Sequence, residues 1–313
     1  MNQFYQDILQ GLLATPKYLP SKYFYDAEGD IIFQQIMHSP EYYLTNCELE
    51  ILQHQTEALV QVFKEQLNTY DLVELGAGDA SKTSYLLKHL VNTTTAFTYY
   101  PIDISQHVIA LLETELPSAI PGLLVTGLNG EYFDMLEKAN QLSKKNKVVL
   151  FLGSNIGNMF PEKCLEFCRH LYQMLLPGDI LVMGVDLKKH PQTILSAYND
   201  RQGFTRNFNL NLLNRINREL GADFNLANFD HYPTYDPETG SCKSYLISLK
   251  DQQITLSKTK DVIQLAANEP IFMEVSHKYS PEEIENIAHI TGFTPIAQFY
   301  DSKHWFTDVI WQR

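Results

Sequence analysis

The sequence predicts an α/β protein: a doubly wound, mostly parallel sheet that ends in an antiparallel hairpin, together with a second, smaller α+β domain. Three observations support this prediction. Short apolar runs alternate with amphipathic stretches at helical spacing through the middle of the chain. This alternation stops between residues 189 and 277 and returns at the end of the chain. A length of 313 residues is also natural for two domains of roughly 100–200 residues each.

The alternating part begins with a strand over residues 70–75 (YDLVEL) and a helix over 81–90. Further strands are expected at 96–104, 123–126, 147–152 and 180–185. The helix before the last of these is well marked, because Pro161 suits a first helical turn and Pro177-Gly178 ends the pattern. Strands that alternate with helices of about 10–15 residues indicate a parallel sheet covered on both faces.

The end of the chain predicts a hairpin at the edge of this sheet. A helix over 281–291 is followed by apolar segments at 294–300 and 305–311, which are separated by the sequence DSKH. Neighbouring strands with so short a connection pair in antiparallel fashion. We therefore assign residues 47–188 and 278–313 to the sheet domain, and residues 1–46 and 189–277 to the second domain.

Composition and charge argue against several classes of partner. The chain carries 24 Lys and Arg against 37 Asp and Glu, a net charge of −13, which disfavours nucleic acid. The sequence has no apolar run of about 18 residues, so we expect no membrane partner. Four cysteines and an N-terminus without signal-peptide features indicate a reducing cytoplasm. We infer neither a protein partner nor a metal, since no histidine pairs with carboxylates at metal-ligand spacing.

The first strand leads into a glycine-bearing turn, Glu74-Leu-Gly76-Ala-Gly78. Gly76 permits a tight turn, and Gly78 lets a ligand approach the backbone closely. A dinucleotide site usually has a third glycine three residues later, where this chain has Ser81. Glu74 would also repel a diphosphate and suits a cationic ligand better. The alternative is a plain turn between a strand and a helix.

A second acidic residue, Asp103, ends the next strand about 25 residues after the glycines. A carboxylate at this position can accept hydrogen bonds from ribose hydroxyls, although it could instead cap the following helix. Two acids around a glycine turn favour a nucleoside without a diphosphate, and S-adenosylmethionine (SAM) is the obvious candidate. The terminal hairpin agrees, because Rossmann-like methyltransferase sheets commonly end that way. The same features disfavour a nicotinamide-dependent oxidoreductase.

The fourth strand ends in the segment FLGSNIGN, residues 151–158. Ligands of open α/β sheets bind beyond the carboxyl ends of the strands. Gly153 exposes its backbone at this end, and Asn158 offers a neutral amide. Together they suit the carboxylate and the amine of a zwitterion, although an ordinary turn is the alternative.

Longer segments of the chain resemble one family. KYFYDAEGDIIFQQIMHSPEYYLT, ELGAGDASKT, FLGSNIGN, FNLNLLNRINRELGADF and MEVSHKYSPEEI are similar to segments of the SAM-dependent histidine Nα-methyltransferases of ergothioneine biosynthesis. The resemblance runs almost from end to end. It implies SAM as cofactor and a small-molecule amino-acid substrate. The expected reaction is methylation of the α-amine of free L-histidine, up to the trimethylated betaine hercynine.

The resemblance also implies roles for residues in both expected domains. Gly76, Lys82 and Asp103 would contact SAM, alongside Glu74 and Gly78 of the turn. The amino acid would lie among Tyr25, Phe33, Tyr42, Gly153, Asn158, Tyr198, Glu274 and Ser276.

The amine end of the substrate would be held by four of these residues. Asn158 and Tyr198 would bind the α-carboxylate and the amino group. Tyr25 and Tyr42 would flank and orient the amine, and they are the expected catalytic pair. Phe33 would form a wall of the pocket, and the three ring faces could stabilise a methylated cation by cation–π attraction. Ordinary core packing is the alternative for these rings.

The side chain of the substrate would be held by Glu274 and Ser276, which the resemblance places on the imidazole ring. Residues two apart on a strand face the same way, so the two can act together while His277 faces away. A carboxylate and a hydroxyl can bond both nitrogens of an imidazole. A solvated edge strand is the alternative.

Two positions depart from the family pattern. Leu128 stands where the family has an acidic residue near the adenine, so we expect Asn129 to take over that contact. Ser244 stands where the family usually has Met over the ring, and this change could widen the ring pocket. An N-methyltransferase for another aromatic amino acid, such as tryptophan, therefore stays open. So does a non-catalytic SAM-binding module.

Overall fold

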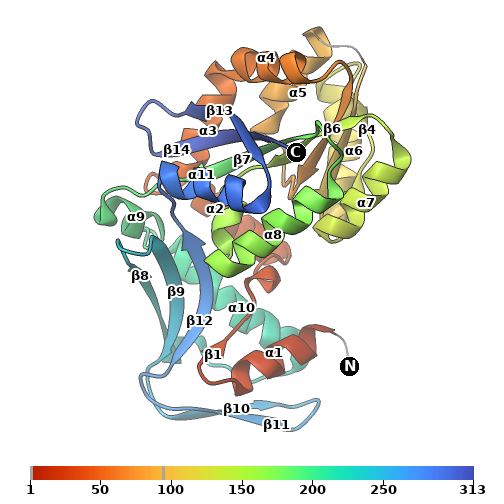
Figure 1. Ribbon diagram of the computed structural model, residues 1–313. Coiled ribbons are helices and arrows are strands. Elements are labelled where there is room, and N and C mark those ends of the chain that lie inside the picture. The colour runs from red at the N-terminus through yellow and green to blue at the C-terminus, as the bar shows by residue number, and fades with distance from the viewer. Residues whose placement is uncertain (1–2, 94–95) are drawn as a thin grey trace. The chain divides into compact units, whose positions relative to one another are not determined.

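The computed structural model of the chain describes residues 3–93 and 96–313, and it contains two compact units (Figure 1). Unit 1 comprises Met1–Tyr43 and Lys189–His277, and unit 2 comprises Leu44–Lys188 and Lys278–Arg313. Residues 1 and 2 of the expected second domain lie outside the described residues. The expected boundary at 46/47 falls inside a helix, α3 (Tyr43–His54), shortly after the division between the units.

Unit 2 is built on one sheet with the strand order β13-β14-β7-β6-β2-β3-β4, in which β5 also pairs with β3. Its strands are β2 (Tyr70–Leu75), β3 (Thr98–Asp103), β4 (Leu124–Val125), β5 (Leu128–Asn129), β6 (Asn146–Phe151), β7 (Ile180–Asp186), β13 (Thr294–Tyr300) and β14 (Phe306–Gln312). Strands β2 to β7 pair in parallel, and β14 runs antiparallel to β7 and β13. The predicted doubly wound sheet with a terminal hairpin is confirmed. Within that hairpin β13 is the edge strand, and β14 lies beside β7.

Helices cover both faces of this sheet, which explains why the central strands β2 and β7 are buried along their whole length. One face packs against α3, α4 (Thr56–Gln66), α5 (Thr83–Thr93) and α6 (Gln106–Ala119), and the other against α7 (Tyr132–Leu142), α8 (Pro161–Met174) and α11 (Pro281–Thr291). Strand β2 shows the alternation, because Leu72 belongs to the first apolar cluster and Val73 to the second. The helices expected at Pro161 and over 281–291 are present.

The strand expected over 123–126 is shorter than predicted. Strand β4 covers two residues, and β5 adds two more after a break at Gly127. The backbone N–H of Gly127 donates to the Glu113 side chain at 2.8 Å. A Cβ atom at Gly127 would lie 2.4 Å from a methyl carbon of Ile109 on α6, so helix packing interrupts the strand here.

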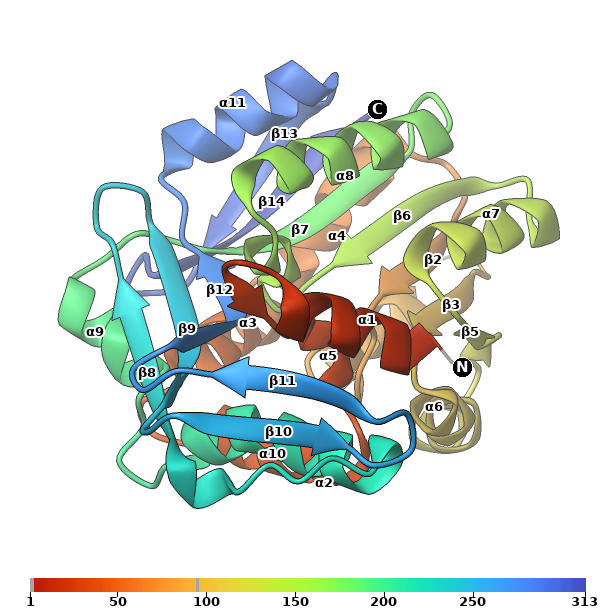
Figure 2. The same cartoon turned by 90° about the horizontal axis from the view of Figure 1, so that it is seen from below.

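Unit 1 combines a four-stranded sheet, a two-stranded hairpin and several helices (Figure 2). The sheet has the order β1-β12-β9-β8, and its strands are β1 (Lys17–Tyr18), β8 (Phe229–Tyr235), β9 (Ser241–Ser248) and β12 (Pro270–His277). The helices are α1 (Gln3–Leu13), α2 (Ala27–Met37), α9 (Pro191–Ala197) and α10 (Phe204–Leu220). Strand β1 pairs Lys17 with Ile271 and Tyr18 with Phe272, so the sheet joins the N-terminal segment to the late insertion.

The hairpin of unit 1, β10 (Gln252–Leu256) and β11 (Asp261–Leu265), was not assigned from the sequence. Its inner residues Ile254 and Ile263 are buried in the same apolar cluster as Leu213 of α10. The N–H of Ser257 donates to the carbonyl oxygen of Gly221, just after α10, at 2.9 Å. The hairpin therefore covers the core of unit 1 instead of extending the four-stranded sheet (Figure 2).

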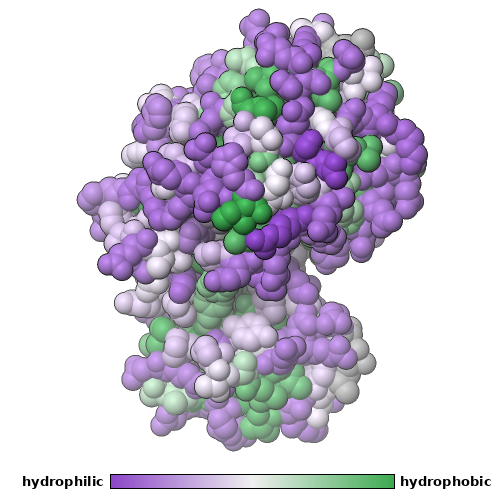
Figure 3. All heavy atoms as spheres, in the orientation of Figure 1, coloured by the Kyte–Doolittle hydropathy of each residue, from purple (hydrophilic) through white to green (hydrophobic). Residues whose placement is uncertain are grey.

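The surface is largely hydrophilic on the face seen in Figure 3, where apolar residues form small separate groups. This agrees with the excess of acidic side chains in the composition. Among the described residues, none of the helices combines the length and the apolar character that crossing a membrane requires.

Candidate active site

The glycine turn after β2 has the backbone geometry that its glycines require. Gly76 has φ of +75° and Gly78 has φ of +53°, in the region where other residues are strained. A Cβ atom at Gly76 would lie 2.9 Å from the Tyr132 hydroxyl, whereas one at Gly78 would meet no atom within 4 Å. The turn is thus closed on the side of α7 and open at Gly78, where close approach of a ligand was predicted.

Asp103 at the end of β3 bonds back to this turn. Its Oδ2 accepts a hydrogen bond from the N–H of Gly78 at 3.2 Å, and its Oδ1 accepts one from the N–H of Ser105 at 2.9 Å. The cap of α6 is Ser105, whose side chain accepts from the N–H of Val108 at 3.3 Å. The alternative in which Asp103 caps the helix is therefore wrong. Its contact with a ribose stays a prediction.

Glu74 is 3% exposed, and both of its carboxylate oxygens accept hydrogen bonds within unit 2. Oε1 accepts from the Thr83 hydroxyl at 2.6 Å, and Oε2 accepts from the Tyr99 hydroxyl. Burial raises the pKa of Glu74 to about 7, although the two hydroxyls oppose this rise. Glu74 thus connects the end of β2 to Thr83 and Tyr99 below the glycine turn. A direct contact between Glu74 and the cofactor stays a prediction.

Lys82 follows the turn and forms an ion pair with Glu48 of α3. The other oxygen of Glu48, Oε1, accepts a hydrogen bond from the N–H of Gly153 at 2.7 Å. Burial lowers the pKa of Lys82, but the charge and the hydrogen bond of Glu48 outweigh it and raise the pKa above its usual value. Glu48 was not among the expected site residues, and nothing in the sequence distinguishes it from Glu50 two positions later.

The loop after β6 carries the two predicted residues Gly153 and Asn158. Gly153 has φ of +74° and Ser154 has φ of +57°, and a short 3-10 turn (Asn155–Asn158) follows. The Ser154 hydroxyl accepts from the N–H of Asp186 at 3.1 Å, which ties the loop to β7. A Cβ atom at Gly153 would lie 3.8 Å from Nζ of Lys82. Asn158 is exposed at the end of this loop.

Asn129 lies beside Asp103 at the carboxyl ends of β5 and β3. Its side-chain N–H groups donate to the carbonyl oxygens of Asp103 at 3.0 Å and Ile104 at 2.9 Å. Leu128 is buried in the core of unit 2, while Asn129 is exposed. An adenine contact at this edge would therefore come from Asn129 or its backbone, and this contact stays a prediction.

The aromatic residues predicted around the amine form a continuous cluster in unit 1. Ring centroids lie 5.5 Å apart for Tyr25 and Phe33, 6.5 Å for Phe33 and Tyr42, and 6.3 Å for Tyr42 and Tyr198. Asp26 caps α2 by accepting from the N–H of Gly29 at 2.8 Å, which sets Tyr25 just before the helix. The ring of Phe208 on α10 packs 5.6 Å from Tyr25 and 5.7 Å from Phe33. Phe208 was not among the residues expected in this cluster.

The polar residues predicted on the substrate ring adjoin this cluster. The Tyr198 hydroxyl donates to Oγ of Ser276 at 2.7 Å, and the carbonyl oxygen of Tyr198 lies 3.0 Å from Nε2 of His231. In the pairing of β12 with β9, Glu274 lies opposite Ser244 and Ser276 opposite Cys242.

Residues directly opposite each other share one face of an antiparallel sheet. Glu274, Ser276 and Ser244 therefore lie on the same face, next to Tyr198. Ser244, the residue that departs from the family pattern, is the cross-strand neighbour of Glu274.

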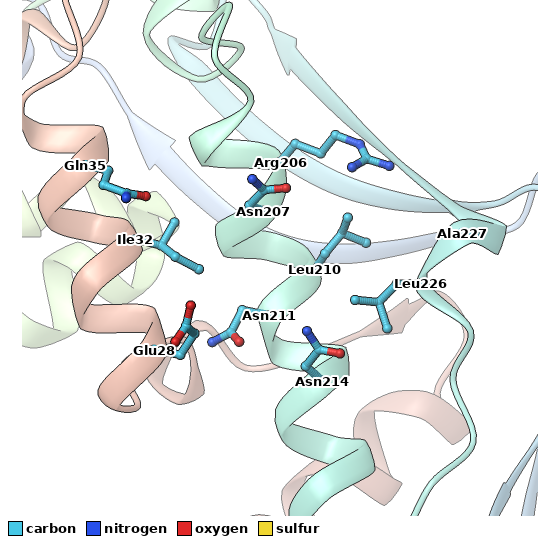
Figure 4. Close-up of a pocket in the computed structure, with 10 residues that line it drawn as sticks. All are labelled: Glu28, Ile32, Gln35, Arg206, Asn207, Leu210, Asn211, Asn214, Leu226 and Ala227. Atoms are coloured by element: carbon cyan, nitrogen blue, oxygen red, sulfur yellow. The ribbon is translucent and has the colours of Figure 1, made fainter.

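A pocket of about 490 Å³ lies elsewhere in unit 1, between α2 and α10 (Figure 4). Its ten lining residues are Glu28, Ile32, Gln35, Arg206, Asn207, Leu210, Asn211, Asn214, Leu226 and Ala227. None of them is a predicted site residue, and the pocket lacks the aromatic rings of the cluster. Among the described residues, no three His, Cys, Asp or Glu side chains come together as metal ligands.

Comparison with known proteins identifies the family. A family model described as "Histidine-specific methyltransferase, SAM-dependent" matches residues 4–313. A histidine N-alpha-methyltransferase from Mycolicibacterium smegmatis is 33% identical, over 97% of this chain and 90% of the relative. One from Mycobacterium tuberculosis is 32% identical over the same shares. An L-tryptophan methyltransferase from Psilocybe serbica is 28% identical, over 95% of this chain and 89% of the relative. The chain therefore belongs to the SAM-dependent, histidine-specific methyltransferases.

Proposed function

We propose that the chain transfers methyl groups from SAM to the α-amine of free L-histidine, up to trimethylated hercynine. The observation that carries this proposal is the shared face of Glu274 and Ser276 next to Tyr198 and Tyr42 in unit 1. A carboxylate and a hydroxyl beside aromatic rings match the two nitrogens and the flat faces of an imidazole. Membership of the family supports the same substrate.

Unit 2 would hold the cofactor and unit 1 most of the amino acid. The residues around the glycine turn fit SAM, because the turn is open at Gly78 and has the carboxylate of Asp103 at its edge. Lys82 offers a cation to the carboxylate of the methionine tail. Gly153 and Asn158 of unit 2 would hold the zwitterionic end of the substrate. When bound, SAM supplies an electrophilic methyl group to the amine lone pair, and its thioether leaves without a proton.

The chain itself has to position an uncharged amine and tolerate the cation that forms. Tyr25 and Tyr42 would orient the amine, and positioning of this kind can lower a barrier by several kcal/mol. The nitrogen gains positive charge as its new bond to carbon forms. Each methylated ammonium then loses a proton to water before the next transfer, until three methyl groups are present. The faces of Tyr25, Phe33 and Tyr42 would stabilise these cations by about 0.5–2 kcal/mol for each contact.

A second candidate is N-methylation of another aromatic amino acid such as tryptophan. Ser244 favours it, because a serine opposite Glu274 leaves more room for a large ring than the methionine usual in the family. The relative from Psilocybe serbica supports this possibility. Under either candidate the partner is a free amino acid. We propose the cytoplasm as its compartment, because the chain has only four cysteines and all four are buried.

One experiment separates these candidates. The protein is incubated with SAM and each of the common amino acids in turn, and products with one, two or three added methyl groups are detected by mass spectrometry. Methylation of histidine alone supports the proposal, and methylation of tryptophan alone supports the second candidate. Binding of SAM without any transfer would instead indicate a non-catalytic module.

A further inference from the structure

Glu48 is a buried carboxylate that joins two loops of the proposed cofactor region. It lies on α3 with an exposed fraction of 0%, and its two oxygens have different partners. Oε2 accepts from Nζ of Lys82, and Oε1 accepts from the N–H of Gly153 at 2.7 Å. One side chain therefore connects the loop after β2 with the loop after β6.

The sheet provides space for this carboxylate at Gly184 of β7. A Cβ atom at Gly184 would lie 2.1 Å from Oε1 of Glu48, so any other residue would displace the carboxylate. The φ of Gly184 does not lie in the left-handed region, so close approach, and not backbone conformation, explains this glycine. A glycine inside a central strand weakens the packing of that strand, because it has no side chain to bury. The carboxylate is thus accommodated by the fold.

Asp308 of β14 lies opposite Gly184 and is a second buried acid beside Glu48. Both of its oxygens are buried without a hydrogen-bond partner among the described residues. Burial and the charge of Glu48 raise its pKa well above the usual value, while Lys82 lowers it. The raised pKa favours the protonated form of Asp308, and Lys82 is the cation that pairs with Glu48.

We propose that Glu48 is a positioning residue that holds the ammonium of Lys82 and the backbone of Gly153 next to one another. This inference rests on the proposed function, in which Lys82 meets the carboxylate of SAM and Gly153 meets the amino acid. An ammonium has three donors, and the bond to Glu48 uses one and leaves two for a ligand carboxylate. Glu48 therefore controls where the remaining donors point. It links the affinity for SAM to the shape of the amino-acid loop.

The two interactions of Glu48, with Lys82 and with Gly153, can be tested separately. In E48Q the amide oxygen still accepts from Gly153, but the amide nitrogen cannot accept from Lys82. In E48A both interactions are lost. We expect E48Q to weaken SAM binding by about ten-fold in isothermal titration calorimetry, since hydrogen bonds to charged groups carry this order of effect. We expect E48A to weaken SAM binding as much and, in addition, to raise the histidine KM by several-fold.

A merely structural role is excluded by two further measurements. In the background of K82M, E48Q should cause little further loss of SAM affinity, because two residues that act through one contact are not additive. D308N replaces the buried acid by an uncharged amide of similar shape, and this variant should bind SAM like the wild type. Thermal unfolding of each variant shows whether it is folded.

The inference is overturned if folded E48Q binds SAM as tightly as the wild type, or if the losses from E48Q and K82M simply add. If E48Q does not fold, E48D replaces it, because aspartate keeps the charge but its shorter side chain moves the carboxylate away from the position that orients Lys82. The same loss of SAM affinity is then expected. SAM binding is measured without turnover, so a failure to methylate histidine would overturn the proposed function and leave this test intact.

Discussion

The two units hold their site residues by different means. In unit 2 the polar groups bond to one another: Glu48 to Lys82, Glu74 to two hydroxyls and Asp103 to backbone N–H groups. In unit 1 aromatic rings pack at centroid distances of 5.5–6.5 Å, and a pair of hydroxyls adjoins them. Changes in unit 2 should therefore alter charge balance, pH dependence and cofactor affinity. Changes in unit 1 alter shape and therefore amino-acid KM and selectivity.

The largest effect is expected from the pH dependence of Glu74. Its pKa is raised from 4.5 to about 7, so the folded state binds a proton more tightly than the unfolded state. The stability of the wild type relative to E74Q should therefore fall as the pH rises from about 4.5 to 7, and then level off. At 1.36 kcal/mol per pKa unit the change is at most about 3 kcal/mol.

Urea unfolding of the wild type and E74Q at pH 5, 6, 7 and 8 measures this difference. Glutamine resembles the protonated acid, because it can accept from one hydroxyl and donate to the other. Parallel stability curves for the two proteins across this range would show that Glu74 titrates like an ordinary glutamate. Such a result would remove one of the contrasts between the units.

The next largest effect is expected in unit 1, from E274A. Loss of a charged partner for the imidazole should raise the histidine KM by about 100-fold, since a site built for a polar group discriminates strongly when that bond is missing. SAM affinity should change little, because Glu274 and the glycine turn belong to different units. Steady-state kinetics and calorimetry measure the two quantities. E274Q keeps the shape and one acceptor, and it should lie between the wild type and E274A.

Equal losses of histidine and SAM affinity in E274A would show that the ring site is misplaced. They would also weaken the contrast between the units, since a change in unit 1 would then affect the affinity for the cofactor. The thermal stability of E274A serves as a control for folding.

Local patterns were sufficient to predict most of unit 2. Strand β2 (Tyr70–Leu75), helix α11 (Pro281–Thr291) and strand β13 (Thr294–Tyr300) have the predicted bounds. A strand buried on both faces is a continuous apolar run, and the capping box of Ser280 and Glu283 marks a helix start. These signals lie within a few residues of sequence, so they are visible without the fold.

Long-range contacts explain which site residues could not be predicted from the sequence. Glu48 lies 34 residues from Lys82 and 105 from Gly153, and nothing near it in the sequence indicates either partner. Phe208 joins the aromatic cluster from α10, where its spacing predicts ordinary core packing. The candidate residues themselves came mainly from the family resemblance. For most of these residues, the local sequence pattern is equally consistent with core packing or with a plain turn.

A smaller effect is expected from Y198F. This change removes the hydroxyl that donates to Ser276 at 2.7 Å but keeps the ring that packs 6.3 Å from Tyr42. We expect the histidine KM to rise by about ten-fold, because one buried hydrogen bond is lost. S276A removes the same bond from the other side. Kinetics of the double variant should therefore show a smaller loss than the two single losses combined, and full additivity would mean that the bond between the two hydroxyls contributes nothing beyond their separate contacts with the substrate.

The smallest effect is expected from S244M, and it tests whether shape governs unit 1. Ser244 is 3% exposed and lies opposite Glu274. If the space beside it is the ring pocket, methionine can extend into that space with little loss of thermal stability. Histidine KM should then change by no more than a few-fold, while any transfer to tryptophan falls further, because the larger ring loses room.

Ser248 on the same strand provides the matched control. Its exposed fraction is 0%, and its hydroxyl donates to the carbonyl oxygen of Lys250 at 2.8 Å. Methionine at this position has no pocket to enter, and overpacking of a filled core costs about 1–3 kcal/mol. S248M should therefore unfold at a lower temperature than S244M. If both variants lose the same stability, then Ser244 borders filled core instead of a ring pocket, and the preference for histidine must arise from Glu274 and Ser276 alone.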